Sequence, residues 1–122
     1  MPAEERETYD LIGSDKVEGT SVYGTGDEKI GSIERVMINK RSGKVAYAVI
    51  GFGGFLGMGN DHFPVPWAQL TYDTQLGGYR THISKQQLEG APRYSSESEW
   101  NWSDPSQGRR VYDYYGTEWF AI

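Results

Sequence analysis

The glycine-rich stretch at residues 51–59 is the first place where this sequence could carry chemistry. A dinucleotide-binding fingerprint requires G-x-G-x-x-G at the start of a helix, so that backbone N–H groups meet the pyrophosphate. Gly51 and Gly53 fit this pattern, but Leu56 stands at the third glycine position, and a proline at residue 64 follows soon after. We therefore predict no nucleotide cofactor and interpret the glycines as a tightly curved connection between strands.

The two histidines, His62 and His82, fit no catalytic pattern. Asp61 precedes His62, but adjacent residues on a strand point to opposite faces, so these two side chains do not form a dyad. The sequence has no cysteine, which excludes disulfides, thiolate metal sites and a cysteine nucleophile. Neither H-E-x-x-H nor G-x-S-x-G occurs. We predict no catalytic residue and no metal site, and we expect a protein that is not an enzyme.

Arg109 and Arg110 lie next to Val111 and Tyr112, and basic residues beside aromatics can bind single-stranded RNA. The chain as a whole carries 12 Lys and Arg against 17 Asp and Glu, a net charge of −5. Binding to phosphates requires a basic face, so nucleic acid is not an expected partner. We expect these arginines to pair with a carboxylate or to stack on a Trp or Tyr ring.

Large apolar residues gather in two segments, the glycine-rich stretch and the aromatic-rich C-terminal extension at residues 94–122. A disordered tail is normally poor in aromatic residues. We therefore expect the extension to pack on the rest of the domain or on a second subunit. Trp and Tyr dominate the energetics of protein interfaces. The predicted partner-binding residues are Phe55, Leu56, Met58, Trp100, Trp102, Tyr114, Tyr115 and Trp119.

Short strands must position these residues, because glycine and aromatic residues are both abundant and turn signals recur at close intervals. The pattern predicts strands near residues 16–23, 31–40, 45–52, 61–70, 70–73 and 78–83, with a short helical turn at 68–70. The second and third strands form a hairpin. Alternation slips once near Glu34, which indicates a β-bulge. Pro64 and Pro66 place their strand at a sheet edge or a barrel corner.

One short helix is predicted at residues 84–89, where Ser84 can cap the first turn and Gln87 stands at the capping-box position. Residues 94–122 show neither helical nor strand periodicity. Residues 1–9 are charged and polar, as in a flexible N-terminus. The sequence lacks the pattern of a secretory signal and of a membrane span, so we expect a cytoplasmic protein without membrane insertion.

Four pieces of the sequence resemble, in order and spacing, those of a PRC-barrel domain. They are IGSIE at 30–34, GKVAYAV at 43–49, GGFLG at 53–57 and FPVPW at 63–67. The resemblance implies a mainly β fold, a small and strongly bent barrel, which we assign to residues 10–93. It also implies a free-standing bacterial protein related to the cytoplasmic domain of the reaction-centre H subunit and to the C-terminal domain of a ribosome maturation factor.

Docking to a protein partner is the property that this resemblance implies. We expect a non-enzymatic protein-binding or scaffold module that forms a homodimer and uses no cofactor. One alternative is a ribosome- or RNA-associated assembly factor, which would bind ribosomal particles in a salt-dependent manner. Another is a small ligand-binding barrel or enzyme, which would contain an enclosed pocket with convergent polar groups.

Overall fold

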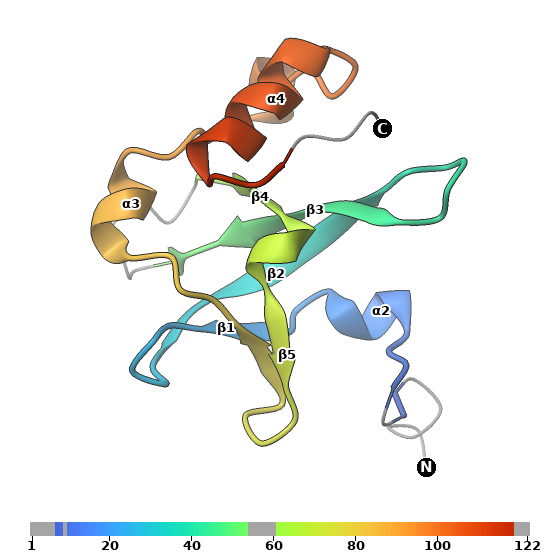
Figure 1. The fold of residues 1–122 in the computed structure, drawn as a ribbon, viewed down its shortest axis with the longest axis vertical. Coiled ribbons are helices and arrows are strands. Elements are labelled where there is room, and N and C mark those ends of the chain that lie inside the picture. Colours follow the sequence, from blue (N-terminus) through green and yellow to red (C-terminus); the bar gives the residue numbers. More distant parts are fainter. Residues whose placement is uncertain (1–6, 9, 54–60, 119–122) are drawn as a thin grey trace.

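The computed structural model describes residues 7–8, 10–53 and 61–118. In that part of the chain one mixed sheet has the strand order β4-β3-β2-β1-β6-β5 (Figure 1). The strands are β1 Ser21–Tyr23, β2 Lys29–Ile38, β3 Val45–Gly51, β4 Phe63–Pro66, β5 Thr71–Asp73 and β6 Gly78–Arg80. All neighbours are antiparallel except β1 and β6, which run parallel. The prediction of a mainly β, strongly bent sheet is confirmed, although the sheet does not close into a ring.

The β2–β3 hairpin is the longest pairing in the sheet. Its turn is held by the Asn39 side chain, whose Oδ1 accepts hydrogen bonds from the backbone N–H groups of Arg41 and Ser42, each at 2.9 Å. The predicted bulge is confirmed, because the register of β2 against β3 shifts between Ile33 and Arg35. This extra residue changes which face of the sheet each later side chain occupies.

The predicted strand at residues 16–23 is wrong in its first half. Ser14–Val17 form the short helix α2, and β1 begins only at Ser21. Gly19 ends the helical path with a φ of +86°, which glycine adopts without strain. Val17 is buried, but it lies in this helix and not on a strand, so strand alternation does not explain its burial.

Strand β4 lies at one edge of the sheet, as its prolines predicted. Pro64 pairs with Val49 and Pro66 with Tyr47, so these four residues share one face. Every residue of β4 is nevertheless buried, which means that both faces of this edge are covered. The inner face holds the apolar core, and its fully buried members include Val22, Ile33, Ala48, Ile50, Phe63 and Val65.

Helix α4, Pro105–Tyr114, covers the outer face and corrects the prediction that residues 94–122 lack regular structure (Figure 1). Asp104 is its N-cap and accepts a hydrogen bond from the N–H of Ser106, while Pro105 occupies the first helical position. Both are favoured helix-start residues. The Tyr112 hydroxyl donates to the Ala46 carbonyl at 2.7 Å, which ties the helix to β3.

Three shorter helical turns complete the described chain: η2 Trp67–Gln69, α3 Lys85–Glu89 and η3 Glu97–Glu99. The helix predicted at residues 84–89 is confirmed, and the Ser84 hydroxyl accepts a hydrogen bond from the Gln87 N–H as a cap. The predicted turn at residues 68–70 appears as η2, one residue earlier. This turn lies between β4 and β5, which are at opposite ends of the strand order.

Candidate protein-binding groove

An aromatic layer fastens the C-terminal extension to the outer face of β3 and β4. The Tyr47 ring lies 5.5 Å from Trp102 and 5.4 Å from Tyr112, measured between centroids. Trp102 in turn lies 6.0 Å from Trp100, which is 5.6 Å from Tyr94. These tilted and edge-on arrangements are the ones that the ring quadrupoles favour. The layer holds residues 94–114 against the sheet in one defined position.

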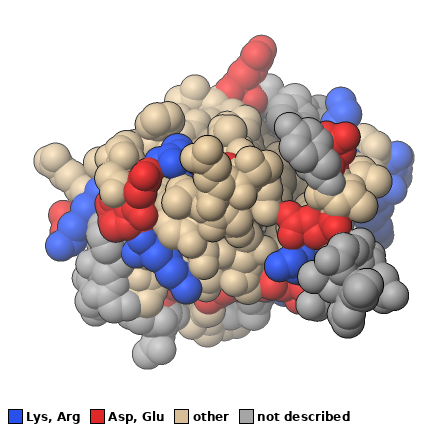
Figure 2. Space-filling model, turned by 90° about the horizontal axis from the view of Figure 1, so that it is seen from below, with Lys and Arg blue, Asp and Glu red and all other residues tan. Residues whose placement is uncertain are grey.

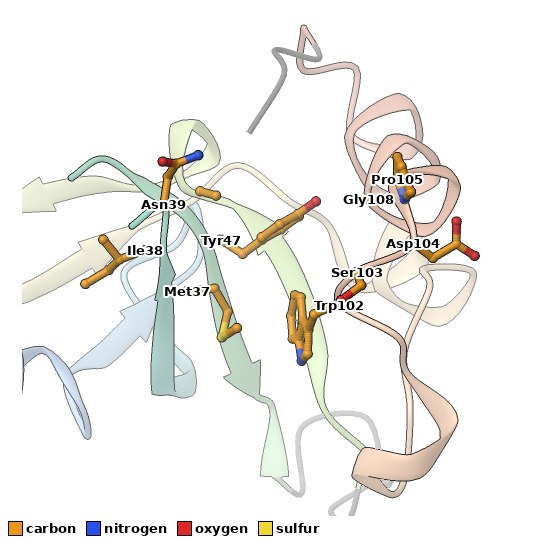
Figure 3. Close-up of a pocket in the computed structure, with 10 residues that line it drawn as sticks. Met37, Ile38, Asn39, Tyr47, Trp102, Ser103, Asp104, Pro105 and Gly108 are labelled. Atoms are coloured by element: carbon orange, nitrogen blue, oxygen red, sulfur yellow. The ribbon is translucent and has the colours of Figure 1, made fainter. Parts of the chain in front are cut away.

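A groove opens where this layer ends, between the outer end of β2 and the start of α4 (Figure 3). Met37 of β2, Tyr47 of β3 and Trp102 of the extension are arranged around it, while the Ile38 side chain points away to the other side of its strand. The groove has a volume of about 250 Å³ and is mainly apolar. Small-molecule sites occupy about 300–1,000 Å³ and are more enclosed. This groove therefore suits a side chain or a short peptide segment.

Asp104 lies at the polar rim of the groove, and its carboxylate carries a negative charge at neutral pH. The hydroxyl and the N–H of Ser106 both donate to the carboxylate and lower the pKa of Asp104.

On the face shown in Figure 2, the described Lys and Arg side chains lie beside Asp and Glu around an uncharged centre. Charges of both signs thus alternate on this face, whereas phosphate binding needs a basic surface.

The structure separates the predicted partner-binding residues into two kinds. Trp102 lines the groove, and Tyr114 is 37% exposed, with its hydroxyl donating to the Gln87 carbonyl. Trp100 and Tyr115 are only 7% and 6% exposed, and both pack into the core cluster. The remaining four, Phe55, Leu56, Met58 and Trp119, lie outside the described residues. The four predicted partner-binding residues that the structure describes form two ring pairs, Trp100 with Trp102 and Tyr114 with Tyr115.

Burial of Tyr115 is unusual in one respect. Its hydroxyl oxygen is buried and has no hydrogen-bond partner in the described structure. Desolvation raises the pKa of Tyr115 well above the usual tyrosine value, with a smaller contribution from Tyr114. The ring thus contributes packing at the end of α4, at the cost of one unsatisfied hydroxyl.

The histidine at residue 62 and the arginine at residue 110 both have partners in the structure. His62 does not pair with Asp61, since its Nδ1 lies 2.6 Å from Glu34 while Asp61 faces Arg93 at 3.5 Å. The Arg110 guanidinium lies 5.9 Å from the centroid of the Trp100 ring, so the predicted stacking on an aromatic ring is confirmed. Among the described residues, no three His, Asp or Glu side chains are placed to hold a metal ion.

Met37 and Tyr47 are groove residues that sequence reasoning missed. Tyr47 belongs to a strand that is apolar on both faces, and this pattern requires a second covering layer. The apolar pattern of this strand therefore indicated a covering layer, but it did not indicate that the C-terminal extension supplies it. The place of Met37 in the groove follows from that of Tyr47, because the two residues pair across β2 and β3.

The sequence profile of the PRC-barrel domain matches residues 10–88, which is well over half of the chain. This chain belongs to the PRC-barrel family. The match ends at α3, so the PRC-barrel domain supplies Met37 and Tyr47 while the opposite wall of the groove lies beyond it. A search of curated proteins by sequence found no match. Within residues 7–8, 10–53 and 61–118, no helix is long and apolar enough to cross a membrane.

Proposed function

We propose that this PRC-barrel protein is a non-enzymatic protein-binding module that forms a homodimer through the groove beside Trp102. The observation that carries the proposal is the construction of this groove. One wall comes from the PRC-barrel domain and the other from the aromatic extension, and the apolar floor between them is open to solvent. Apolar surface removed from water stabilises an association by about 25 cal/mol per Å².

The chemistry of the groove also favours a protein partner. Met37 offers a flexible, polarisable side chain that adapts to different shapes. Trp102 offers a large and rigid surface whose ordering costs little entropy. Polar groups are confined to the rim, at Asn39, Ser103 and Asp104 (Figure 3). An apolar centre inside a polar rim is the usual anatomy of a protein interface.

Sedimentation velocity on the full chain tests this proposal. We expect the wild-type protein to be dimeric at micromolar concentration and Met37→Lys to weaken the dimer by about tenfold or more, because a charge is placed in the apolar floor. Leu11→Lys is the matched control, since Leu11 is 73% exposed and lies away from the groove. A wild-type protein that stays monomeric at high micromolar concentration would overturn the homodimer.

A further inference from the structure

The tip of the β2–β3 hairpin carries three cations beside the groove. Lys40, Arg41 and Lys44 are all exposed, and none of them is paired with a carboxylate in the described structure. The Asn39 side chain and Gly43, with its φ of +77°, fix the turn that presents them. Three cations within five residues, without a carboxylate partner among the residues that the structure describes, stand out in a chain with a net charge of −5.

The groove and the hairpin tip together define the chemistry of an occupant. Asn39 belongs to the lining of the groove and is followed directly by Lys40 and Arg41, so the backbone that carries these cations begins at the edge of the groove. An apolar side chain with a carboxylate next to it would satisfy both parts at once. The carboxylate would contribute chiefly to orientation and association rate, and the apolar side chain to affinity.

Two segments of this chain place a carboxylate directly before a tryptophan, the largest apolar side chain: Glu99–Trp100 and Glu118–Trp119. Glu99 and Trp100 are already engaged within their own chain, since the Glu99 carboxylate accepts from the Ser95 N–H and the Trp100 ring is buried. The other segment is residues 118–122, with the sequence EWFAI, in which a carboxylate is followed by two aromatic residues. Residues 119–122 lie outside the described structure, and Glu118, the last described residue, is exposed.

The chain leaves the described structure close to the outer face of the sheet. Gln69 donates a hydrogen bond from Nε2 to the Thr117 hydroxyl at 2.7 Å, and Gln69 belongs to the turn that follows β4. Pro66, the last residue of β4, pairs with Tyr47 of the groove. Four residues beyond Glu118 extend at most about 14 Å, which is enough to deliver an aromatic side chain to a neighbouring molecule.

We propose that residues 118–122 of one copy occupy the groove of a second copy, with the Glu118 carboxylate facing the hairpin-tip cations. A two-fold arrangement makes this exchange reciprocal, so that two equivalent grooves are filled in one dimer. This inference rests on the proposed self-association and identifies the segment that produces it. It also assigns a role to the three cations at the hairpin tip.

The first test compares the full chain with a chain shortened after Glu118, both by sedimentation velocity. We expect a dimeric full chain and a shortened chain that is monomeric at the same concentration. A second arm titrates a fluorescein-labelled, amidated peptide of residues 117–122 into the shortened chain. We expect saturable binding that weakens about tenfold when Lys40, Arg41 and Lys44 are all replaced by Glu, with Leu11→Lys as the unaffected control.

The peptide in which Glu118 is replaced by Lys provides the matched exchange. It should bind the charge-reversed protein better than the wild-type protein, and loss of this reversal would contradict the role of the cations. A dimeric full chain that remains dimeric after shortening would overturn this inference while leaving the homodimer in place. A monomeric full chain would overturn both.

Disulfide trapping separates exchange between copies from occupancy within one chain, because the protein has no native cysteine. Ser103→Cys places a thiol at the groove, and Phe120→Cys places one in the segment. When the two single variants are mixed and oxidised, we expect a covalent heterodimer. A double variant that forms only an intramolecular disulfide would overturn the second copy as the source of the segment.

Discussion

Tyr47 is the residue at which the PRC-barrel domain and the C-terminal extension meet. Its backbone belongs to β3, while its ring contacts Trp102 and Tyr112 from the extension. Burial raises the pKa of Tyr47 well above the ordinary tyrosine value, so the ring is neutral at physiological pH. A single side chain thereby serves as part of the fold and as the floor of the groove.

Tyr72 gives a prediction about pH at the residue scale. Its hydroxyl donates to Glu7 at 2.5 Å, and this hydrogen bond raises the pKa of Tyr72 to about 12. An unfolded tyrosine has a pKa of about 10, so the folded state holds this proton more tightly. The resulting stabilisation is present below pH 10 and is lost as the pH rises through about 12.

Urea unfolding at a series of pH values between 9 and 12 measures this effect. We expect the wild-type free energy of unfolding to fall across this range, and Tyr72→Phe to make the fall shallower. Other tyrosines with raised pKa values, among them Tyr79 and Tyr112, leave part of the slope in place. Equal slopes for the variant and the wild type would contradict the assignment to Tyr72.

Helix α4 is the element on which the groove depends, because Asp104, Pro105 and Gly108 at its start form one wall. Its first turn leaves backbone N–H groups that no intrahelical carbonyl can satisfy. The Asp104 side chain accepts a hydrogen bond from one of these groups, the N–H of Ser106. The position of this wall is therefore coupled to the capping of the helix.

Asp104→Ala is expected to lower the free energy of unfolding by about 1 kcal/mol, the usual value of an N-cap. Asp104→Asn is the matched control, since asparagine caps about as well as aspartate and should retain most of the stability. Chemical unfolding followed by far-UV circular dichroism measures both. If alanine and asparagine had the same effect, the capping interaction would not be the source of the stability.

The elements that sequence reasoning predicted correctly are those with a local signal. The β2–β3 hairpin, the bulge and the Ser84 cap all follow from residues close to one another in the chain. Helix α4 was missed because its apolar stripe is short: Val111, Tyr112 and Tyr115 are buried on one face, while residues 105–110 carry no large apolar side chain. Asp104 and Pro105 were the available signal for its start.

The groove could be predicted only in part, for a physical reason. Trp102 was identified as a partner-binding residue from its type and its segment. Met37 and Tyr47 join it through the packing of two segments that are more than 50 residues apart, as the numbering shows. Strand alternation indicates that a face is covered, but it carries no information about which segment covers it.

At the scale of the whole molecule, the extension behaves as a second layer of the fold. A chain shortened after Arg93 would lose the buried Trp100, Val111 and Tyr112 and would expose the outer face of β3 and β4. We expect its stability to fall by at least about 3 kcal/mol, since removing one large buried aromatic already costs about that much. Thermal unfolding of this chain, with the chain shortened after Glu118 as control, measures the loss. Equal melting temperatures would show that the layer contributes no stability.

The parallel pairing of β1 with β6 has a consequence for how the protein is made. The β2–β3 hairpin can close as soon as its own residues have left the ribosome, whereas the outer edge of β1 must wait until Tyr79 and Arg80 have been synthesised. Pairings between distant segments form slowly, and an unpaired strand edge invites pairing with other chains. We therefore expect the nascent chain to be most prone to aggregation in the interval before β6 emerges.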